Sequence, residues 1–469
     1  MVVEKKPSFG KTLRIACLLA LLATGLAGCD LLPATPEPSP PTPEPAITAS
    51  PQPTDAVPPG VTQLVFWEPF ALDRPQGLLL GEMIRDFEAE NPDIQIEIVP
   101  KSGYVGIDGA VQAALLAGEQ TELPDLAVAF PSMIAEYAAA GIVAPLDPHL
   151  YDPEVGLTGE ELADFQPGFL EAGRLPGAGR QLLAFPFAQN AVGMWINETV
   201  LAQAGWDHTP ATWSEFEQAC FDVVTNTGVR CYPFVESVST FNAWLYSRGG
   251  QQLDETGRRA TFNDPAGVES LALLRRLMDM GLAWRPQDEY GDYVAFTSGE
   301  AAFTFSSTGN SLLYADAYEA ALQRGVPPFQ WSQAMIPQAD PQNPATTLYG
   351  SEFFIVRSDP ERERAAWRFI RWFTDTMQTA RWASDLQSMP VRVSALQVMT
   401  DTLEAYPFVR AQVEEILPYA RPEPPVAAEL AVRDILYTAI LSVTQAYADP
   451  QIVLDQAARE ANSILSTGP

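Results

Sequence analysis

The sequence is poor in histidine, in positive charge and in long hydrophobic runs. Its 469 residues include only two histidines, His149 and His208, and 28 Lys and Arg stand against 59 Asp and Glu, a net charge of −31. Two histidines leave little material for a histidine-based triad or metal site. So acidic a chain repels the phosphate backbone of nucleic acids. We therefore expect no metal, no cofactor, no nucleic-acid partner and no enzymatic activity.

The hydrophobic run at residues 15–26 is too short to cross a bilayer, which takes about 20 residues, and no later run reaches that length. Basic residues between positions 5 and 14 precede it, as in a secretory signal peptide. The run ends in Leu26-Ala27-Gly28-Cys29, which resembles a bacterial lipobox. This resemblance implies cleavage after residue 28 and a lipid on Cys29. The alternative is an ordinary signal peptide in which the cysteine stands by chance.

Proline is concentrated in one segment, since residues 33–59 hold 11 of the 42 prolines. Such a stretch cannot bury a core and favours extended polyproline II. We expect residues 1–28 to be the signal peptide and residues 29–60 a tether. The lipid on Cys29 would then anchor the protein to the outer face of the cytoplasmic membrane.

Cysteine is scarce as well, because only Cys220 and Cys231 remain beyond the tether. In an oxidising compartment these two thiols predict one disulfide. Closing so short a loop stabilises a fold by about 2–3 kcal/mol on the chain-entropy model. A zinc pair is the weaker alternative, since no nearby Cys or His completes four ligands.

Hydrophobic patterning predicts alternating strands and helices in the first part of the folded chain. Strands are expected at 63–67, 94–99 and 124–130, and helices at 81–90, 109–118 and 132–140. This order predicts right-handed crossovers and a largely parallel sheet, an α/β fold. Ligands bind outside the carboxyl ends of such strands, which singles out Trp67, Glu68 and Phe130.

The same alternation returns later in the chain. Further strands are expected at 183–187, 192–196, 232–235, 301–305 and 353–356, and helices at 213–224, 266–280, 361–375, 403–417 and 427–447. No sequence repeat occurs at a fixed period, which excludes solenoids and propellers.

Short motifs follow one another in a recognisable order. They include Phe66-Trp67, Asn91-Pro92, Pro124-Asp125, Phe185-Pro186, Trp195-Ile196-Asn197, Pro210-Ala211-Thr212-Trp213 and Met389-Pro390-Val391-Arg392. In this order they resemble the family 1 extracellular solute-binding proteins of ABC importers, the group that contains the maltose-binding protein. The resemblance extends from about Thr62 to the C-terminus.

The resemblance implies a two-lobed periplasmic-binding-protein fold, each lobe a mostly parallel sheet flanked by helices. The N-terminal lobe is expected at 61–188 and 336–388, and the C-terminal lobe at 189–335 and 389–469. About three hinge crossings are expected, near 186–191, 335–345 and 385–392.

The resemblance also implies that a small solute binds in the cleft between the lobes and passes to membrane permease subunits. The residues expected to bind it are Trp67, Glu68, Phe130, Asn190, Trp244, Tyr246, Asn310, Gly350, Ser351, Glu352 and Arg392. The 10 Trp, 14 Tyr and 23 Phe favour a carbohydrate, because pyranose faces stack on aromatic rings. Asn310-Ser311 stands where relatives often carry an aromatic residue, which argues against long malto-oligosaccharides.

Alternative classes remain open. A secreted carbohydrate-active enzyme needs only a carboxylate pair, but the sequence has no nucleophile elbow, P-loop, zinc-binding helix motif or dinucleotide fingerprint. A structural surface lipoprotein does not require two lobes. The same fold can also bind an amino acid, peptide, polyamine or polyol. We favour a monomeric, lipid-anchored receptor that captures a mono- or oligosaccharide by hinge closure.

Overall fold

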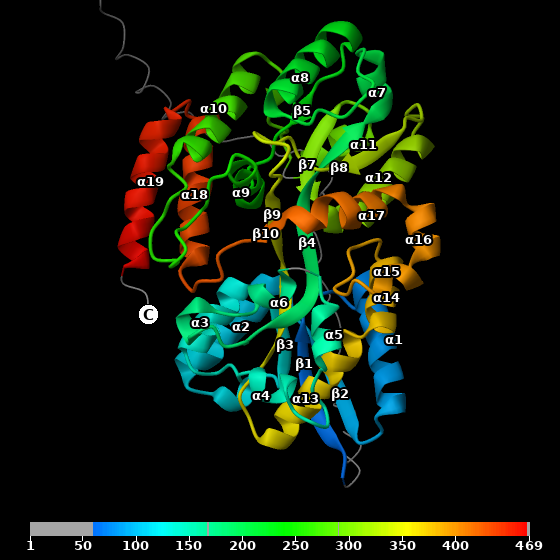
Figure 1. Cartoon of the computed structure of the whole chain (residues 1–469), viewed down its shortest axis with the longest axis vertical. Coiled ribbons are helices and arrows are strands. Elements are labelled where there is room, and N and C mark those ends of the chain that lie inside the picture. The colour runs from blue at the N-terminus through cyan, green and yellow to red at the C-terminus, as the bar shows by residue number, and fades with distance from the viewer. Residues whose placement is uncertain (1–59, 167, 289, 467–469) are drawn as a thin grey trace, which may run out of the picture. The chain divides into compact units, whose positions relative to one another are not determined.

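The computed structural model describes residues 60–466 except 167 and 289, and all of these belong to one compact unit (Figure 1). The predicted signal peptide, Cys29 and the tether up to residue 59 lie outside the described residues. In the part that is described, no helix is long and apolar enough to cross a membrane.

A mixed sheet with the strand order β2-β1-β3-β9-β4-β7 forms the framework of the described chain. Its strands are β1 Thr62–Glu68, β2 Ile94–Pro100, β3 Leu126–Ala129, β4 Phe185–Asn197, β7 Phe303–Ser307, β8 Trp331–Ala334, β9 Thr346–Ile355 and β10 Ala420–Pro422. β1 runs parallel to β2 and β3, as predicted for the early strands. β4, however, runs antiparallel to β7, β8 and β9, and β9 also runs antiparallel to β3, so the sheet is mixed. The short strands β5 Tyr232–Pro233 and β6 Ala283–Trp284 form a separate parallel pair.

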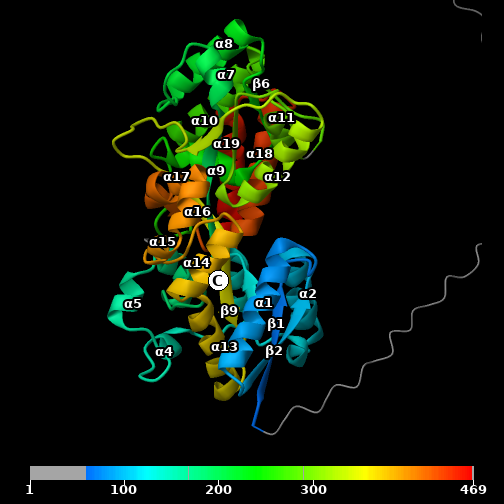
Figure 2. The ribbon, with the colours of Figure 1, turned by 90° about the vertical axis from the view of Figure 1, so that its right-hand side faces the viewer.

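Helices cover both faces of the first part of the sheet. They are α1 Pro75–Glu90, α2 Gly103–Ala117, α3 Pro131–Ala139, α4 Asp147–Leu150, α5 Gly159–Ala163, α6 Phe169–Ala172, α13 Pro360–Phe373, α14 Thr376–Asp385 and α15 Ala395–Val398. α1 and α13 pack against each other, and α2 lies on the other side of β1 (Figure 2). The aromatic rings of Phe66 on β1, Phe87 on α1 and Phe369 on α13 meet in the core between them.

The second part of the chain has its own set of helices. They are α7 Glu198–Gln203, α8 Trp213–Thr227, α9 Val238–Tyr246, α10 Pro265–Asp279, α11 Gly291–Thr297, α12 Ser311–Gln323, α16 Thr400–Ala405, α17 Pro407–Ala411, α18 Glu429–Thr444 and α19 Pro450–Leu465. Capping explains several starts. Thr212 and Glu215 form a capping box at α8, and Asp264 caps α10 ahead of a proline at its first position.

Two separate hydrophobic cores define two lobes, which confirms the predicted fold class. The N-terminal core is built around Phe66, Phe353 and Phe369, and the C-terminal core around Phe216 and Phe305. Because each lobe buries its own apolar surface, the two lobes need to share little beyond the strands that connect them.

The predicted lobe boundaries need correction at two places. Ile336 and Ala345 pack in the C-terminal core, whereas Met389 and Val391 pack in the N-terminal core. The segments 335–345 and 385–392 are therefore loops within one lobe, and their prolines do not mark hinges. The second crossing lies instead in β9.

β4 and β9 carry the chain between the lobes as continuous strands, and Figure 1 shows β4 extending from the region of β3 to that of β7. The two strands predicted at 183–187 and 192–196 are one strand, since Ala188 to Ala191 keep pairing with β9. Gly350 lies at this crossing. A Cβ atom there would lie 2.2 Å from the carbonyl oxygen of Ala188, so no larger residue fits without backbone movement.

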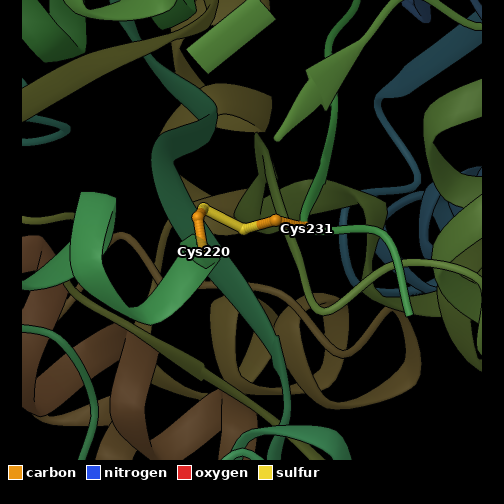
Figure 3. The surroundings of a disulfide bond; sticks show 2 residues. All are labelled: Cys220 and Cys231. Carbon is orange, nitrogen blue, oxygen red and sulfur yellow. A yellow bond between two sulfur atoms is a disulfide. The ribbon is translucent and has the colours of Figure 1, made fainter. Parts of the chain in front are cut away.

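Of the remaining predictions, some are confirmed and others are not. The helix expected at 403–417 is interrupted at Tyr406-Pro407 and ends in a π-helical turn, Gln412–Ile416. The predicted disulfide is present and joins Cys220 on α8 to Cys231 just before β5 (Figure 3). Helices α9, α12, α14 and α19 are among those that were not predicted.

Candidate functional site

The N-lobe contributes a wall of side chains at the carboxyl ends of its parallel strands. Glu68 ends β1, Phe130 follows β3, and Tyr104 lies in the first turn of α2. The Tyr104 hydroxyl donates to Ser351 Oγ on β9 at 2.8 Å, and its ring lies 4.5 Å from that of Phe130. Burial raises the pKa of Tyr104 to about 12, so the phenol stays protonated and able to donate. The structure thus brings three predicted residues, Glu68, Phe130 and Ser351, together around Tyr104, which was not predicted.

Two carboxyl groups at this wall, those of Glu68 and Glu352, are buried. Glu68 accepts from the backbone N–H of Phe70 at 2.6 Å, and Glu352 accepts from Gln189 Nε2 at 2.6 Å. The second oxygen of each carboxyl is buried without a described hydrogen-bond partner. Burial raises the pKa of Glu68, and raises that of Glu352 well above its usual range, because charge is poorly solvated there. Each carboxyl group therefore has one oxygen left for a hydrogen bond to a polar group that comes within reach.

Trp67 carries a cation above its ring. Lys101 Nζ lies 3.8 Å from the centroid of the Trp67 ring, and the backbone N–H of Lys101 donates to the Glu68 carbonyl at 2.8 Å. Lys101 is the only lysine after position 11. Its ammonium forms no ion pair with any described residue, and the cation–π contact holds it at the edge of the wall.

The crossing strands present polar groups next to the wall. Asn190 pairs with Tyr349 across β4 and β9, and its amide lies against Gly309, where a Cβ atom would come within 2.3 Å of Asn190 Oδ1. Burial raises the pKa of Tyr349 to about 12, with Ser307 as its hydrogen-bonding neighbour. The predicted residue Asn190 therefore lies at the crossing, in contact with the turn that begins α12.

The C-lobe contributes an open pocket of about 680 Å³ at the carboxyl ends of β5, β6 and β7. It is lined by Phe234, Val235, Glu236, Arg285, Pro286, Gln287, Asp288, Tyr290, Asp292, Tyr293, Ser306, Asn310, Leu313, Tyr314 and Tyr437. We call this the C-lobe pocket. Asn310, a predicted residue, lies in it and donates to Ser306 Oγ at 2.9 Å. Open α/β folds bind ligands at the carboxyl ends of their strands, and this pocket lies at such a position.

Charge in the C-lobe pocket is unevenly compensated. Arg285 is paired with Glu236, with 2.8 Å between Nε and Oε1. Asp288 and Asp292 have no ion pair with a described cation. Burial raises the pKa of Asp292, against the opposing effect of the Tyr293 backbone N–H. The pocket therefore combines aromatic faces, amides and two uncompensated carboxyl groups.

Three predicted residues lie away from both walls. Trp244 was expected to bind the solute, but it belongs to the buried helix α9, and its ring lies 4.4 Å from that of Trp213. Tyr246 is buried on the same helix. Arg392 is buried in the N-lobe, where it donates to the Glu161 and Thr374 carbonyls and lies over the Phe165 ring. These side chains stabilise their lobes and line neither the wall nor the C-lobe pocket.

Behind Tyr246 lies a buried polar network. Glu423 accepts from Arg433 Nη1 at 2.6 Å and from Asn242 Nδ2 at 3.0 Å. Gln252 donates to Glu429 at 2.8 Å. Burial, with Glu423 as a like-charged neighbour, raises the pKa of Glu429 to about 8. The network fixes α18 against α9.

A second pocket, of about 250 Å³, is lined by residues of both lobes. Ala135, Ala138 and Ala139 of α3 line it from one lobe, and Gly257 and residues 425–428 from the other. Small apolar side chains predominate, so it offers few groups that could recognise a polar solute. The C-lobe pocket is the better candidate.

Tyr104, Lys101, Tyr349 and the tyrosines of the C-lobe pocket were missed from the sequence. Tyr104 and Ser351 are 247 positions apart, so no local pattern reveals their contact. The sequence could have pointed to Lys101, because it is the only lysine after position 11 of an acidic chain. Among the described residues, no group of three or more His, Cys, Asp or Glu gathers as a metal site would require.

Two lobes joined by crossing strands, with polar and aromatic groups at the facing strand ends, define a two-lobed solute-binding protein. The model of the family described as bacterial extracellular solute-binding protein matches residues 82–411. The chain belongs to this family, and it is a solute-binding protein of an ABC importer.

Similarity to individual relatives is distant but covers most of the chain. A protein of Brucella abortus (strain 2308), named only as a binding protein, is 23% identical over 397 residues, 83% of this chain and 90% of the relative. The cyclic α-maltosyl-1,6-maltose binding protein of Arthrobacter globiformis has a TM-score of 0.74 at 22% identity, over 87% of this chain and 100% of its own. UgpB of Mycobacterium tuberculosis, in complex with glycerophosphocholine, has a TM-score of 0.72 at 21% identity, over 87% and 99%. These similarities establish the fold.

Proposed function

We propose that this protein is a lipid-anchored receptor that binds a mono- or oligosaccharide between its lobes and delivers it to a permease. The main support for a carbohydrate as the solute is the composition of the C-lobe pocket. It combines the rings of Phe234, Tyr290, Tyr293 and Tyr437 with amide and carboxyl groups that match paired hydroxyls. The Arthrobacter globiformis relative, which binds a cyclic maltosyl-maltose, supports this class of solute.

Hinge closure would bring the N-lobe wall onto a solute held in the C-lobe pocket. The continuous strands β4 and β9 support this, because a rotation about residues 188–191 and 348–351 moves each core as a rigid body. The apparent affinity then equals the affinity of the contacts reduced by the cost of closing. The lobes are proposed to close as rigid bodies. Their boundaries are the predicted ones, 61–188 with 336–388 and 189–335 with 389–469, changed at the segments 335–345 and 385–392 as described above.

Saccharide binding is tested by thermal unfolding in the presence of neutral and substituted sugars. A solute at 100 times its Kd adds about 2.7 kcal/mol to the free energy of unfolding, which raises Tm. Tyr437→Ala should reduce this shift, because it removes a ring from the C-lobe pocket. Tyr151→Ala, an exposed tyrosine of the N-lobe, is the matched control and should leave the shift unchanged. Stabilisation by amino acids or polyamines alone would contradict a carbohydrate.

Binding without turnover is the second part of the proposal. The saccharide that stabilises the protein should be recovered unchanged after prolonged incubation, as judged by mass spectrometry. Time-dependent cleavage that the wild-type chain performs and a Glu68→Gln variant does not would instead indicate a carbohydrate-active enzyme.

The lipid anchor is tested at Cys29. Cells that express the full chain should retain it in the membrane fraction and incorporate labelled fatty acid into it, whereas Cys29→Ser should abolish both. Unchanged membrane retention of Cys29→Ser would remove the anchor from the proposal and leave the solute-binding function unaffected.

A further inference from the structure

We propose that the solute carries a positively charged amino group in addition to its hydroxyls, and that Asp288, Asp292 and the surrounding tyrosines of the C-lobe pocket bind this group. The chemical class is an amino sugar with a free amine, alone or within a short oligosaccharide. The inference rests on the proposed function, because it names the saccharide class for the same pocket.

The charge of the pocket gives the first argument. Three carboxyl groups, of Glu236, Asp288 and Asp292, face a single cation, Arg285, and that cation is already paired with Glu236. Thr444 and Gln445 also donate to Glu236, which holds that carboxylate in place. Asp288 and Asp292 therefore remain for a ligand cation.

The aromatic side chains give a second, independent argument. Tyr290 and Tyr293 lie with their ring centroids 6.2 Å apart at an angle of 55°, and Tyr437 and Phe234 line the same pocket. Rings set at an angle around a cavity offer their negative faces to a cation, as in the aromatic cages that hold ammonium groups. Neutral pyranose rings also stack on such faces, so only the combination with uncompensated carboxyl groups favours an amine.

A buried hydroxyl gives the third argument. Tyr314 lines the pocket and is 1% exposed, and its hydroxyl has no aligned hydrogen-bond partner among the described residues. Ser306 and Thr304 are the polar side chains beside it, and the Thr304 hydroxyl is itself buried without a described partner. A buried hydroxyl left without a partner is costly, and a polar group of the ligand would supply one.

The same features disfavour an anionic sugar. A phosphate or carboxylate in the C-lobe pocket would meet two uncompensated carboxyl groups and no free arginine. Lys101, whose ammonium forms no ion pair with a described residue, belongs to the other lobe. Sugar phosphates and uronic acids are therefore expected to bind more weakly than neutral sugars.

The experiment compares matched sugars that differ in one substituent. Calorimetric titration of the full chain in detergent at pH 6.5 would use three β-1,4-linked disaccharides with the same skeleton. They carry a free amine (chitobiose), an acetamide (diacetylchitobiose) or a hydroxyl (cellobiose) at the 2-position. Glucosamine, N-acetylglucosamine and glucose, and an α-linked set, extend the panel. We expect the amine-bearing member of the best-binding set to bind at least 10-fold more tightly than its neutral counterparts, with the preference shrinking as salt rises.

Variants locate the preference. Asp292→Asn should reduce the ratio between amine and hydroxyl forms about 10-fold while neutral sugars still bind. Asp288→Asn, at an exposed position, should act in the same direction and covers the event that Asp292→Asn misfolds. Glu460→Gln on the exposed face of α19 makes the same charge change and should leave the ratio unchanged.

The outcomes separate the inference from the function on which it rests. Equal or tighter binding of a neutral sugar than of its amine counterpart would overturn the amino-sugar inference and leave the saccharide receptor intact. An amine preference that survives both aspartate variants would overturn the assignment to this pocket. If no member of the panel binds, the proposed function falls as well.

Discussion

The two walls of the candidate cleft are built in opposite ways. The N-lobe wall is closely packed, and its polar groups are joined internally, as Tyr104 is to Ser351 and Gln189 is to Glu352. The C-lobe pocket is open, with Tyr290 and Tyr437 substantially exposed and Asp288 unpaired. An open pocket can take a ligand before any movement, whereas a packed wall meets it only on closure. From this difference we expect the C-lobe to determine which solute binds. The N-lobe and the crossing strands should determine how tightly the solute is enclosed.

The largest expected effect concerns buried carboxyl groups, which both lobes contain. The pKa of Glu429 is raised to about 8, so the folded state binds a proton that the unfolded state releases near pH 4.5. Stability is therefore expected to fall as pH rises between these values, at a cost of about 1.4 kcal/mol per unit of pKa shift. Glu429→Gln should remove this loss and make the protein several kcal/mol more stable than wild type at pH 8.5, and about equal to it at pH 4.

Urea unfolding at both pH values measures this prediction. Glu352→Gln is the N-lobe counterpart, since burial raises its pKa in the same direction. If Glu429→Gln leaves the pH dependence unchanged while Glu352→Gln removes it, the N-lobe rather than the C-lobe limits stability at alkaline pH.

The next effect concerns the crossing that joins the two walls. Gly350→Ala places a Cβ atom 2.2 Å from the Ala188 carbonyl oxygen, a backbone atom that cannot move freely. We expect a loss of about 3 kcal/mol in the free energy of unfolding. Gly309→Ala is the matched control, because its Cβ would meet the movable side-chain end of Asn190. It should cost less stability but reduce solute affinity. Equal losses from both variants would contradict the view that the backbone at Ala188 cannot move away as easily as the Asn190 side chain.

The disulfide should affect the C-lobe alone. Replacing Cys220 and Cys231 together by alanine opens a loop of 11 residues and should cost about 2–3 kcal/mol. Hydrogen exchange should show the loss in α8 and β5, with β1 to β3 of the N-lobe unchanged. Loosening of both lobes to the same degree would show that they unfold as one cooperative unit.

The smallest effect concerns the N-lobe wall itself. Tyr104→Phe removes the hydrogen bond to Ser351 and should lower stability by about 1 kcal/mol. Because the wall meets the solute only after closure, the variant should speed solute dissociation more than it slows association. Stopped-flow fluorescence measures the two rates, and an effect confined to association would place Tyr104 outside the closed site.

The sequence predicted elements whose pattern is local and failed where the pattern is not. Strand β1 and helix α13 were located because apolar residues recur at strand or helix spacing. Helix α9 was missed because every residue from Val238 to Tyr246 is buried, which leaves no polar face to reveal a period. Trp244 and Tyr246 were therefore predicted as solute contacts without the knowledge that both lie on a buried helix. The continuity of β4 across the lobes depends on its pairing with β9, more than 150 residues away.

The candidate site was partly predictable for the same reason. Glu68 ends a strand, Phe130 and Asn310 come shortly after one, and the position of a strand end can be read locally. Tyr293 and Tyr437 come from α11 and α18, and only the tertiary fold brings them into one pocket. Arg392 was assigned to a crossing because of the neighbouring proline, but that segment packs in the N-lobe core.

Closure on a saccharide is the central claim, and small-angle X-ray scattering tests it most directly. The Cys29→Ser protein should be measured alone and when saturated with the tightest-binding sugar of the panel. The account predicts a smaller radius of gyration in the saturated sample, and Gly309→Ala should need more sugar to reach the same value. Saturable binding by calorimetry with an unchanged radius of gyration would contradict hinge closure.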